Sequence, residues 1–160
     1  MNRLPSPHRP RALAPIPHVA GVDYDVLDEL IGYTLRRAQV AMFLAFHEAT
    51  RGLEITPPRF TALVIVGANP GIGQSALGQV LGIARSGAMM LTDWMEQRGL
   101  AERHQRPGDR RAWGVYLTAR GEREVARMKR RVLAEDRRRS AKLGAGERRR
   151  LLALLKKLAG

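Results

Sequence analysis

The chain has 160 residues, and its 28 Lys and Arg outnumber its 15 Asp and Glu, which gives a formal net charge of +13. This basic excess indicates a polyanionic partner, above all nucleic acid, with an anionic membrane surface as the second candidate. The lack of cysteine excludes disulfides and thiolate metal sites, and no apolar run reaches the roughly 18–20 residues that span a bilayer. We therefore expect a soluble, cytoplasmic protein that uses neither a metal nor a cofactor.

The first 20 residues contain five of the nine prolines. Because proline removes a backbone donor and interrupts helices, we expect residues 1–20 to form an extended, flexible arm. From Tyr24 to about Gly52 proline is absent, and apolar residues recur at three- and four-residue steps. This spacing predicts one long amphipathic helix, with Asp23 or Asp25 as its N-cap.

Thr56 and Pro57 have the pattern of an N-cap and a first helical residue, so a second helix is expected to begin there. A two-turn helix over 74–81, a tight turn at Gly82-Ile83 and a longer helix over 84–98 follow. This order is the spacing of a helix-turn-helix, although many helical hairpins share it.

The next segment has the pattern of a β-hairpin. Residues 100–103 are expected to form a strand, residues 105–109 a turn, and residues 112–117 a second strand in which apolar side chains alternate. A hairpin directly after a helix-turn-helix is a wing. Its tip is basic, with Arg103, His104, Arg106, Arg110 and Arg111.

The remaining residues predict two more helices. Thr118 is expected to cap a long basic helix that ends near Ser140, and the last helix carries Leu151, Leu154, Leu155 and Leu158 on one face. The predicted fold class is thus mainly α with a small β wing. The predicted domains are an arm (1–20), a dimerisation helix (21–52), a winged helix-turn-helix domain (53–118) and further dimerisation helices (119–160).

The order of the elements and a specific set of residues resemble the MarR family of winged helix-turn-helix transcriptional regulators. That set is Gly99-Leu100-Ala101-Glu102-Arg103, Pro107-Gly108-Asp109-Arg110-Arg111, Leu117-Thr118 and Gly121. The resemblance implies an obligate homodimer, with a helical dimerisation core and two lobes that bind double-stranded DNA. It does not imply an enzyme, and no triad, paired carboxylates, P-loop or metal cluster can be assembled.

In a helix-turn-helix, the N-terminal residues of the second helix face base edges, and their free N–H groups can meet a phosphate. Met89 and Met90 replace a threonine and an arginine that are frequent in the family, so base contacts are expected to be more apolar. The expected DNA-contacting residues are Gln74, Ser75, Arg85, Ser86, Gly87, Met89, Met90, Arg103, His104, Arg106 and Arg110.

Three residues are expected to orient the wing. Asp109 and Arg111 match the family's D-x-R signature, and Asp93 occupies the place of the family aspartate that pairs with the wing arginine. A bidentate contact between carboxylate and guanidinium fixes geometry. Its net contribution to stability as a surface ion pair would be only about 0–1 kcal/mol.

The segment GYTLRRAQ, residues 32–39, resembles that of a MarR subgroup linked to the catabolism of hydroxycinnamates and related aromatic acids. Arg36 and Arg37 would then hold a small anionic aromatic effector or its CoA thioester. An equally weighted alternative is that both arginines pair across the dimer with Asp28 or Glu29. The expected ligand-binding residues are Tyr33, Arg36, Arg37, Phe43, Phe46 and His47, and Arg127, Arg130 and Arg131 are candidates for the phosphates of a thioester.

These features favour a ligand-responsive DNA-binding regulator. We interpret it as a repressor that binds a palindromic operator and is released from it by a small aromatic acid or its CoA thioester. The alternative is an architectural protein that binds DNA without sequence preference, because the net charge alone would permit it.

Overall fold

The computed structural model of the chain describes residues 14–106 and 109–160, without the side chains of residues 106–111. The chain forms two compact units, one that ends at Ala45 and one that comprises Phe46–Gly160. Among the described residues, no helix has the length and apolarity that crossing a membrane requires.

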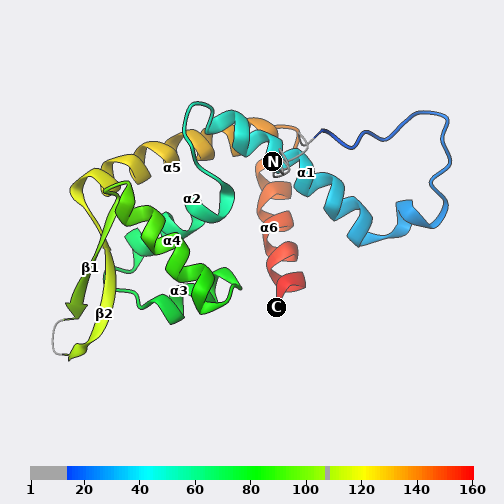
Figure 1. Ribbon diagram of the computed structural model, residues 1–160. Helices are drawn as coiled ribbons and strands as arrows, with labels where there is room; N and C mark the ends of the chain where they lie inside the picture. The colour runs from blue at the N-terminus through cyan, green and yellow to red at the C-terminus, as the bar shows by residue number, and fades with distance from the viewer. Residues whose placement is uncertain (1–13, 107–108) are drawn as a thin grey trace, which may run out of the picture. The chain divides into compact units, whose positions relative to one another are not determined.

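The first unit contains the 3-10 helix η1 (Asp25–Glu29) and most of α1 (Ile31–Ala49) (Figure 1). The single long helix predicted for this segment is wrong, because Leu30 is extended (φ −84°, ψ 116°) between the two helices. Neither Asp23 nor Asp25 is the N-cap, because Tyr24 holds that position of the 3-10 helix without a side-chain cap, although Oδ1 of Asp23 accepts from the N–H of Asp25 at 2.9 Å. A 3-10 turn and an α-turn repeat at similar steps, so apolar spacing alone does not reveal the break.

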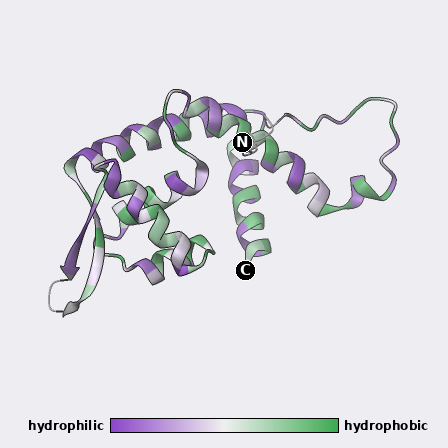
Figure 2. Ribbon diagram, in the orientation of Figure 1, coloured by the Kyte–Doolittle hydropathy of each residue, from purple (hydrophilic) through white to green (hydrophobic). Residues whose placement is uncertain are grey.

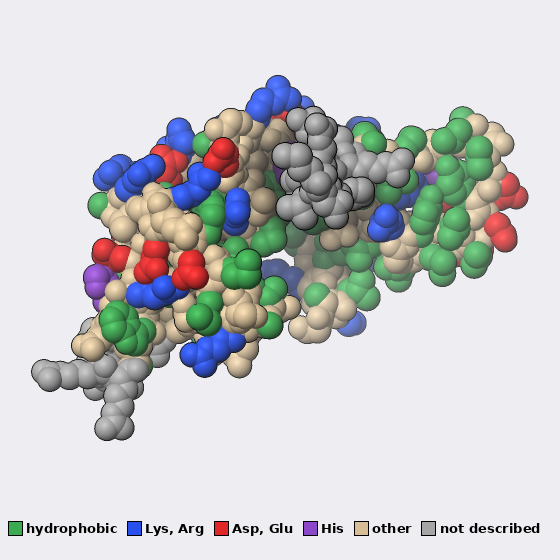
Figure 3. Space-filling view, in the orientation of Figure 1, with side chains coloured by type: hydrophobic (Ala, Val, Ile, Leu, Met, Phe, Trp, Pro, Cys, Tyr) green, Lys and Arg blue, Asp and Glu red, His purple; other side chains and the backbone are tan. Residues whose placement is uncertain are grey.

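Hydrophobic side chains of the first unit are open to solvent, as Figure 3 shows over its surface. Eight of them are each 37 % exposed or more, namely Val19, Val22, Val26, Leu27, Leu30, Ile31, Leu35 and Met42. An apolar surface of this extent is characteristic of a face that another chain or ligand covers.

After the end of α1, the second unit contains α2 (Pro57–Ala68), α3 (Gln74–Leu81) and α4 (Arg85–Gln97), which confirms the three predicted helices. Gly82 ends α3 in the left-handed conformation (φ 64°), which glycine adopts at little cost. The three helices share one core, in which the fully buried side chains include Leu63, Val66, Leu77 and Met95.

The wing is an antiparallel hairpin of β1 (Ala101–Arg106) and β2 (Asp109–Leu117). The strands run further than the sequence predicts, because β1 includes Gln105 and Arg106, which were expected in the turn. These positions carry polar side chains and so lack the apolar alternation that marks a strand. An isolated bridge between Ile72 and Val115 adds the connection before α3 to the hairpin.

Two helices complete the second unit, α5 (Ala119–Arg139) and α6 (Ala145–Ala159). Thr118 caps α5 as predicted, since its Oγ1 accepts from the N–H of Gly121 at 3.0 Å. The hydrophilic colour of most of α5 in Figure 2 agrees with its short list of buried residues, Gly121, Val125 and Met128. Helix α6 has no buried residue in the described structure, and Leu151, Leu152, Leu154 and Leu158 are 42–56 % exposed.

Candidate DNA-binding surface

Helix α4 presents its N-terminal half to solvent. Arg85, Ser86, Met89 and Met90 are exposed, whereas Gly87 is half-buried. Met90 is 72 % exposed, more than any other large hydrophobic side chain among the described residues. This face therefore offers one guanidinium, one hydroxyl and two flexible apolar side chains to a partner.

The start of α4 can also accept an anion through its backbone. Ala84, the N-cap residue, has no side-chain acceptor for the free N–H groups of the first turn. Unsatisfied N–H groups and the positive end of the helix dipole favour a phosphate at this position.

A groove of about 480 Å³ separates the start of α4 from the wing. It brings together five of the predicted DNA-contacting residues, although they come from α3, α4 and β1. Its lining comprises Gly73, Gln74, Ser75, Arg85, Met89, Arg103, Ala112 and Trp113. Trp113, which is 57 % exposed, also lines the groove, although it is not among the residues expected to contact DNA.

The guanidinium of Arg103 links the wing to α4. Its Nη2 pairs with Oδ1 of Asp93, and its Nη1 lies 2.8 Å from Oε2 of Glu96. With its amide turned so that the oxygen faces the guanidinium, Gln74 accepts from Nη2 and Nε at 3.1 and 3.2 Å. These partners favour a positioning role for Arg103, whose side chain is only 27 % exposed.

The other wing residues are described in part. His104 is exposed, with Nε2 2.9 Å from Oε1 of Glu102. The side chains of Arg106, Asp109, Arg110 and Arg111 lie outside the described residues, so their expected roles, including the pair of Arg111 with Asp93, stay predictions.

The expected effector residues fall in both compact units. In the first unit, Arg37 lies over the ring of Tyr33 at 5.8 Å, and its Nε donates to the carbonyl of Ile16 at 3.4 Å. Arg36 is exposed and Phe43 is half-buried. Asp28, one of the proposed partners of the two arginines, lies 3.2 Å from Nε2 of His18.

In the second unit, Phe46 packs against the ring of Phe60 with centroids 5.5 Å apart and contacts the core. His47 is exposed. Phe46 therefore has a packing role in this structure, whether or not it also contacts a ligand. Among the described residues, no three His, Asp or Glu side chains are grouped so that they could hold a metal ion.

A helix-turn-helix followed by an anchored hairpin, with an exposed second helix, defines a winged helix-turn-helix protein. Comparison with known proteins agrees with this class. The MarR family model matches residues 53–112. A transcriptional regulatory protein for the hcr operon of Thauera aromatica is 35 % identical over 129 residues, which are 80 % of this chain and 78 % of that protein.

Two solved structures of the transcriptional repressor CouR are also similar. CouR bound to a 23-mer DNA duplex has a TM-score of 0.81 at 35 % identity and covers 87 % of this chain and 99 % of its own. CouR bound to p-coumaroyl-CoA has a TM-score of 0.74 at 33 % identity, with coverages of 86 % and 97 %. The chain belongs to the MarR family of transcriptional regulators.

Proposed function

We propose that this protein is a homodimeric repressor that binds a palindromic operator and is released by an aromatic acid or its CoA thioester. The observation that carries the DNA-binding part is the exposed N-terminal face of α4, with Arg85, Met89 and Met90 beside a wing held by Arg103. An α-helix fits the major groove of B-DNA, and arginine is the most common reader of guanine there.

The proposal of a dimer is based on apolar side chains that a single chain leaves exposed. The leucines of α6 and the exposed apolar residues of η1 and α1 are too many for a stable monomer surface. A two-fold dimer would place two copies of α4 about one turn of DNA apart, which predicts half-site centres about 10–10.5 bp apart.

The effector class rests on similarity together with local chemistry. CouR, which resembles this chain over most of its length, is recorded in complex with p-coumaroyl-CoA. Here Arg37 and Tyr33 form a guanidinium–aromatic pair, and Arg36 is exposed next to it. An aromatic acid can stack on Tyr33 while its carboxylate, or the phosphates of a thioester, meet the two arginines.

A footprint on the DNA upstream of the gene tests the first half of the proposal. We expect protection of one palindrome that persists with excess nonspecific DNA at physiological salt. Arg85→Ala should raise the protein concentration needed for the footprint, whereas Arg149→Ala, an exposed arginine on α6, should leave that concentration unchanged. Equal protection of unrelated sequences would favour the architectural alternative.

A further inference from the structure

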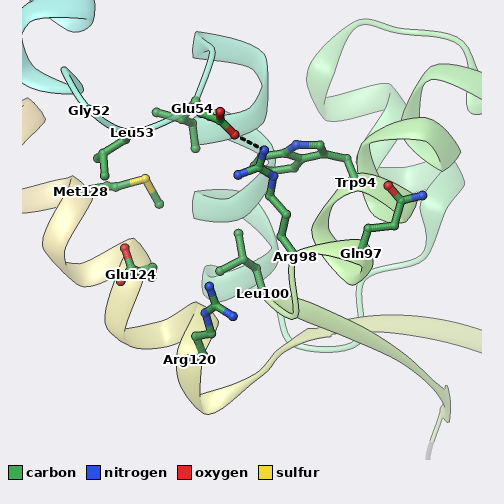
Figure 4. Close-up of a pocket in the computed structure, with 11 residues that line it drawn as sticks. Gly52, Leu53, Glu54, Trp94, Gln97, Arg98, Leu100, Arg120, Glu124 and Met128 are labelled. Atoms are coloured by element: carbon green, nitrogen blue, oxygen red, sulfur yellow. Dashed lines mark hydrogen bonds and ion pairs between the residues drawn. The ribbon is translucent and has the colours of Figure 1, made fainter.

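The winged lobe, defined here as residues 52–128, contains a second hollow, which shares no residue with the groove beside α4 or with the expected effector residues. It has a volume of about 590 Å³ and lies where the α1–α2 connection, the end of α4 and the first turns of α5 meet (Figure 4). Sites for small organic ligands commonly fall within about 300–1,000 Å³.

The floor of this cavity is apolar. Ile55 and Leu100 are each 8 % exposed and Met128 is 4 % exposed, so the floor is well packed from beneath. The indole of Trp94 forms part of the wall. A flat, apolar molecule would find both an aliphatic surface and an aromatic face here.

The rim of the cavity is cationic. Arg98 reaches across Trp94, 5.4 Å from the ring centroid, and pairs with Glu54. Arg59 lies over the same ring at 4.5 Å. Arg120, from the first turn of α5, has no ion pair or hydrogen bond with any described residue and is exposed.

These charges are not balanced locally. Glu124 pairs with Arg127 at 2.8 Å and Glu54 pairs with Arg98, so Arg120 is the lining cation that has no carboxylate partner among the described residues. The hydrogen bond from Arg98 holds the pKa of Glu54 below its usual value, so this carboxylate is ionised at neutral pH. The guanidinium of Arg120 therefore remains available to an anion.

We propose that this cavity is a second ligand site, within the winged lobe itself, for a small aromatic carboxylate. The ring lies against Trp94 and the apolar floor, and the carboxylate meets the guanidinium groups of Arg120 and Arg98. A planar guanidinium binds a carboxylate through two parallel hydrogen bonds, which a phenol or an uncharged ring cannot form.

The cavity lies between α4 and α5, and DNA binding depends on the position of α4 relative to the rest of the lobe. Trp94 and Arg98 belong to the end of α4, and Arg120 belongs to α5. Leu100 joins them, since its N–H donates to the carbonyl of Met95 and its carbonyl accepts from the N–H of Thr118. A ligand there adjusts the position of α4 independently of the effector proposed for Arg36 and Arg37.

Indole NMR on the ¹⁵N-labelled full chain tests the proposal, because the chain has two tryptophans and Trp113→Phe assigns their N–H signals. Titration with 4-hydroxybenzoate should shift the Trp94 signal in a saturable way. The uncharged 4-methylphenol should bind at least about ten-fold more weakly, because it lacks the charge-assisted contact.

Single-residue variants test whether Arg120 contacts the carboxylate of the ligand. Arg120→Ala and Arg120→Gln should each weaken 4-hydroxybenzoate about ten-fold or more, whereas Arg123→Ala, an exposed arginine on the next turn of α5, should leave the affinity unchanged. The double variant of Arg36 and Arg37 to Ala should also bind as the parent does, which separates this site from the proposed effector site. Unchanged affinity in both Arg120 variants, or loss of the Trp94 shift in the Arg36 and Arg37 variant, would overturn the proposal.

Discussion

Asp93 on α4 and Arg103 on β1 form an ion pair, and the same guanidinium reaches Glu96 one turn further along the helix at 2.8 Å. A single arginine of the wing therefore binds two carboxylates of the helix that presents Arg85 and Met90. Because the contact joins the wing to α4, it restrains the angle between the two elements.

Arg103→Ala should accordingly weaken operator binding by about ten-fold or more while the dimer stays intact, because the wing loses its attachment to α4. Fluorescence anisotropy with a labelled duplex gives the affinity, and light scattering gives the oligomeric state. His104→Ala, a change at the neighbouring exposed position, is the matched control and should have a smaller effect. An Arg103→Ala variant with the affinity of the parent would contradict the positioning role.

A double-mutant cycle distinguishes the two possible partners of Asp93. If Arg103 is the partner, Asp93→Ala should add little to the effect of Arg103→Ala, because either change already frees the contact. The predicted pair with Arg111 demands the same non-additivity for Asp93→Ala and Arg111→Ala. If the two effects in a cycle are additive, the arginine of that cycle is not the partner of Asp93.

The exposed face of α4 predicts base contacts by one charged side chain and by two methionines. Arg85→Ala should weaken operator binding by about 1–3 kcal/mol and relax the preference at one base pair. Met90→Ala should lower discrimination at positions with thymine, whose methyl group is the apolar feature of the major groove. Affinities for a set of single-base operator variants measure both effects, and a uniform loss across all sequences would argue against base contact.

The element order of the winged lobe could be predicted from the sequence because its signals are local. Gly82 and Gly99 mark helix ends, Thr118 caps α5, and Val115 and Leu117 mark the buried face of β2. The attachment of the wing was harder to predict. Arg103 lies on β1 and its partners Asp93 and Glu96 lie on α4. The motif indicated Arg111 as the partner of Asp93, so the contact of Arg103 with α4 could not be predicted from the sequence.

Gly121 shows how a short motif encodes a close approach. A Cβ atom at this position would lie 1.9 Å from the carbonyl oxygen of Leu100, so no side chain fits without backbone movement. Gly121→Ala should lower the free energy of unfolding by about 3 kcal/mol. Urea denaturation measures the change, and Gly146→Ala is the control, because a Cβ there meets nothing within 4 Å. Equal stability of the two variants would mean that the approach of α5 to Leu100 is looser than described.

The leucines of α6 predict dependence on a second copy of the chain. Replacing Leu154 and Leu158, which are 55 % and 56 % exposed, with Glu should convert the dimer to a monomer and abolish operator binding. Light scattering after size exclusion reads out the mass. The paired control is Lys156 and Lys157 to Glu, which changes charge by a larger amount on the same turn. If the leucine variant is still a dimer, α6 does not contribute to the dimer interface.

The effector residues were the least predictable part of the chain, because apolar and aromatic spacing does not distinguish packing from ligand contact. Phe46 packs on Phe60, whereas Tyr33 lies beside Arg37. The contact of Arg37 with the carbonyl of Ile16 was also absent from the sequence pattern, since it joins residues 21 positions apart across a proline-containing segment.

The most direct test of the central claim is titration of the preformed operator complex with p-coumaroyl-CoA, followed by fluorescence anisotropy. The account predicts release at saturating thioester, with at least ten-fold weaker DNA affinity, about 1.4 kcal/mol, in the parent protein. The double variant of Arg36 and Arg37 to Ala should resist release. An operator affinity that stays unchanged at saturating concentrations of the thioester and of the free acids would contradict ligand-responsive repression by this class of effector.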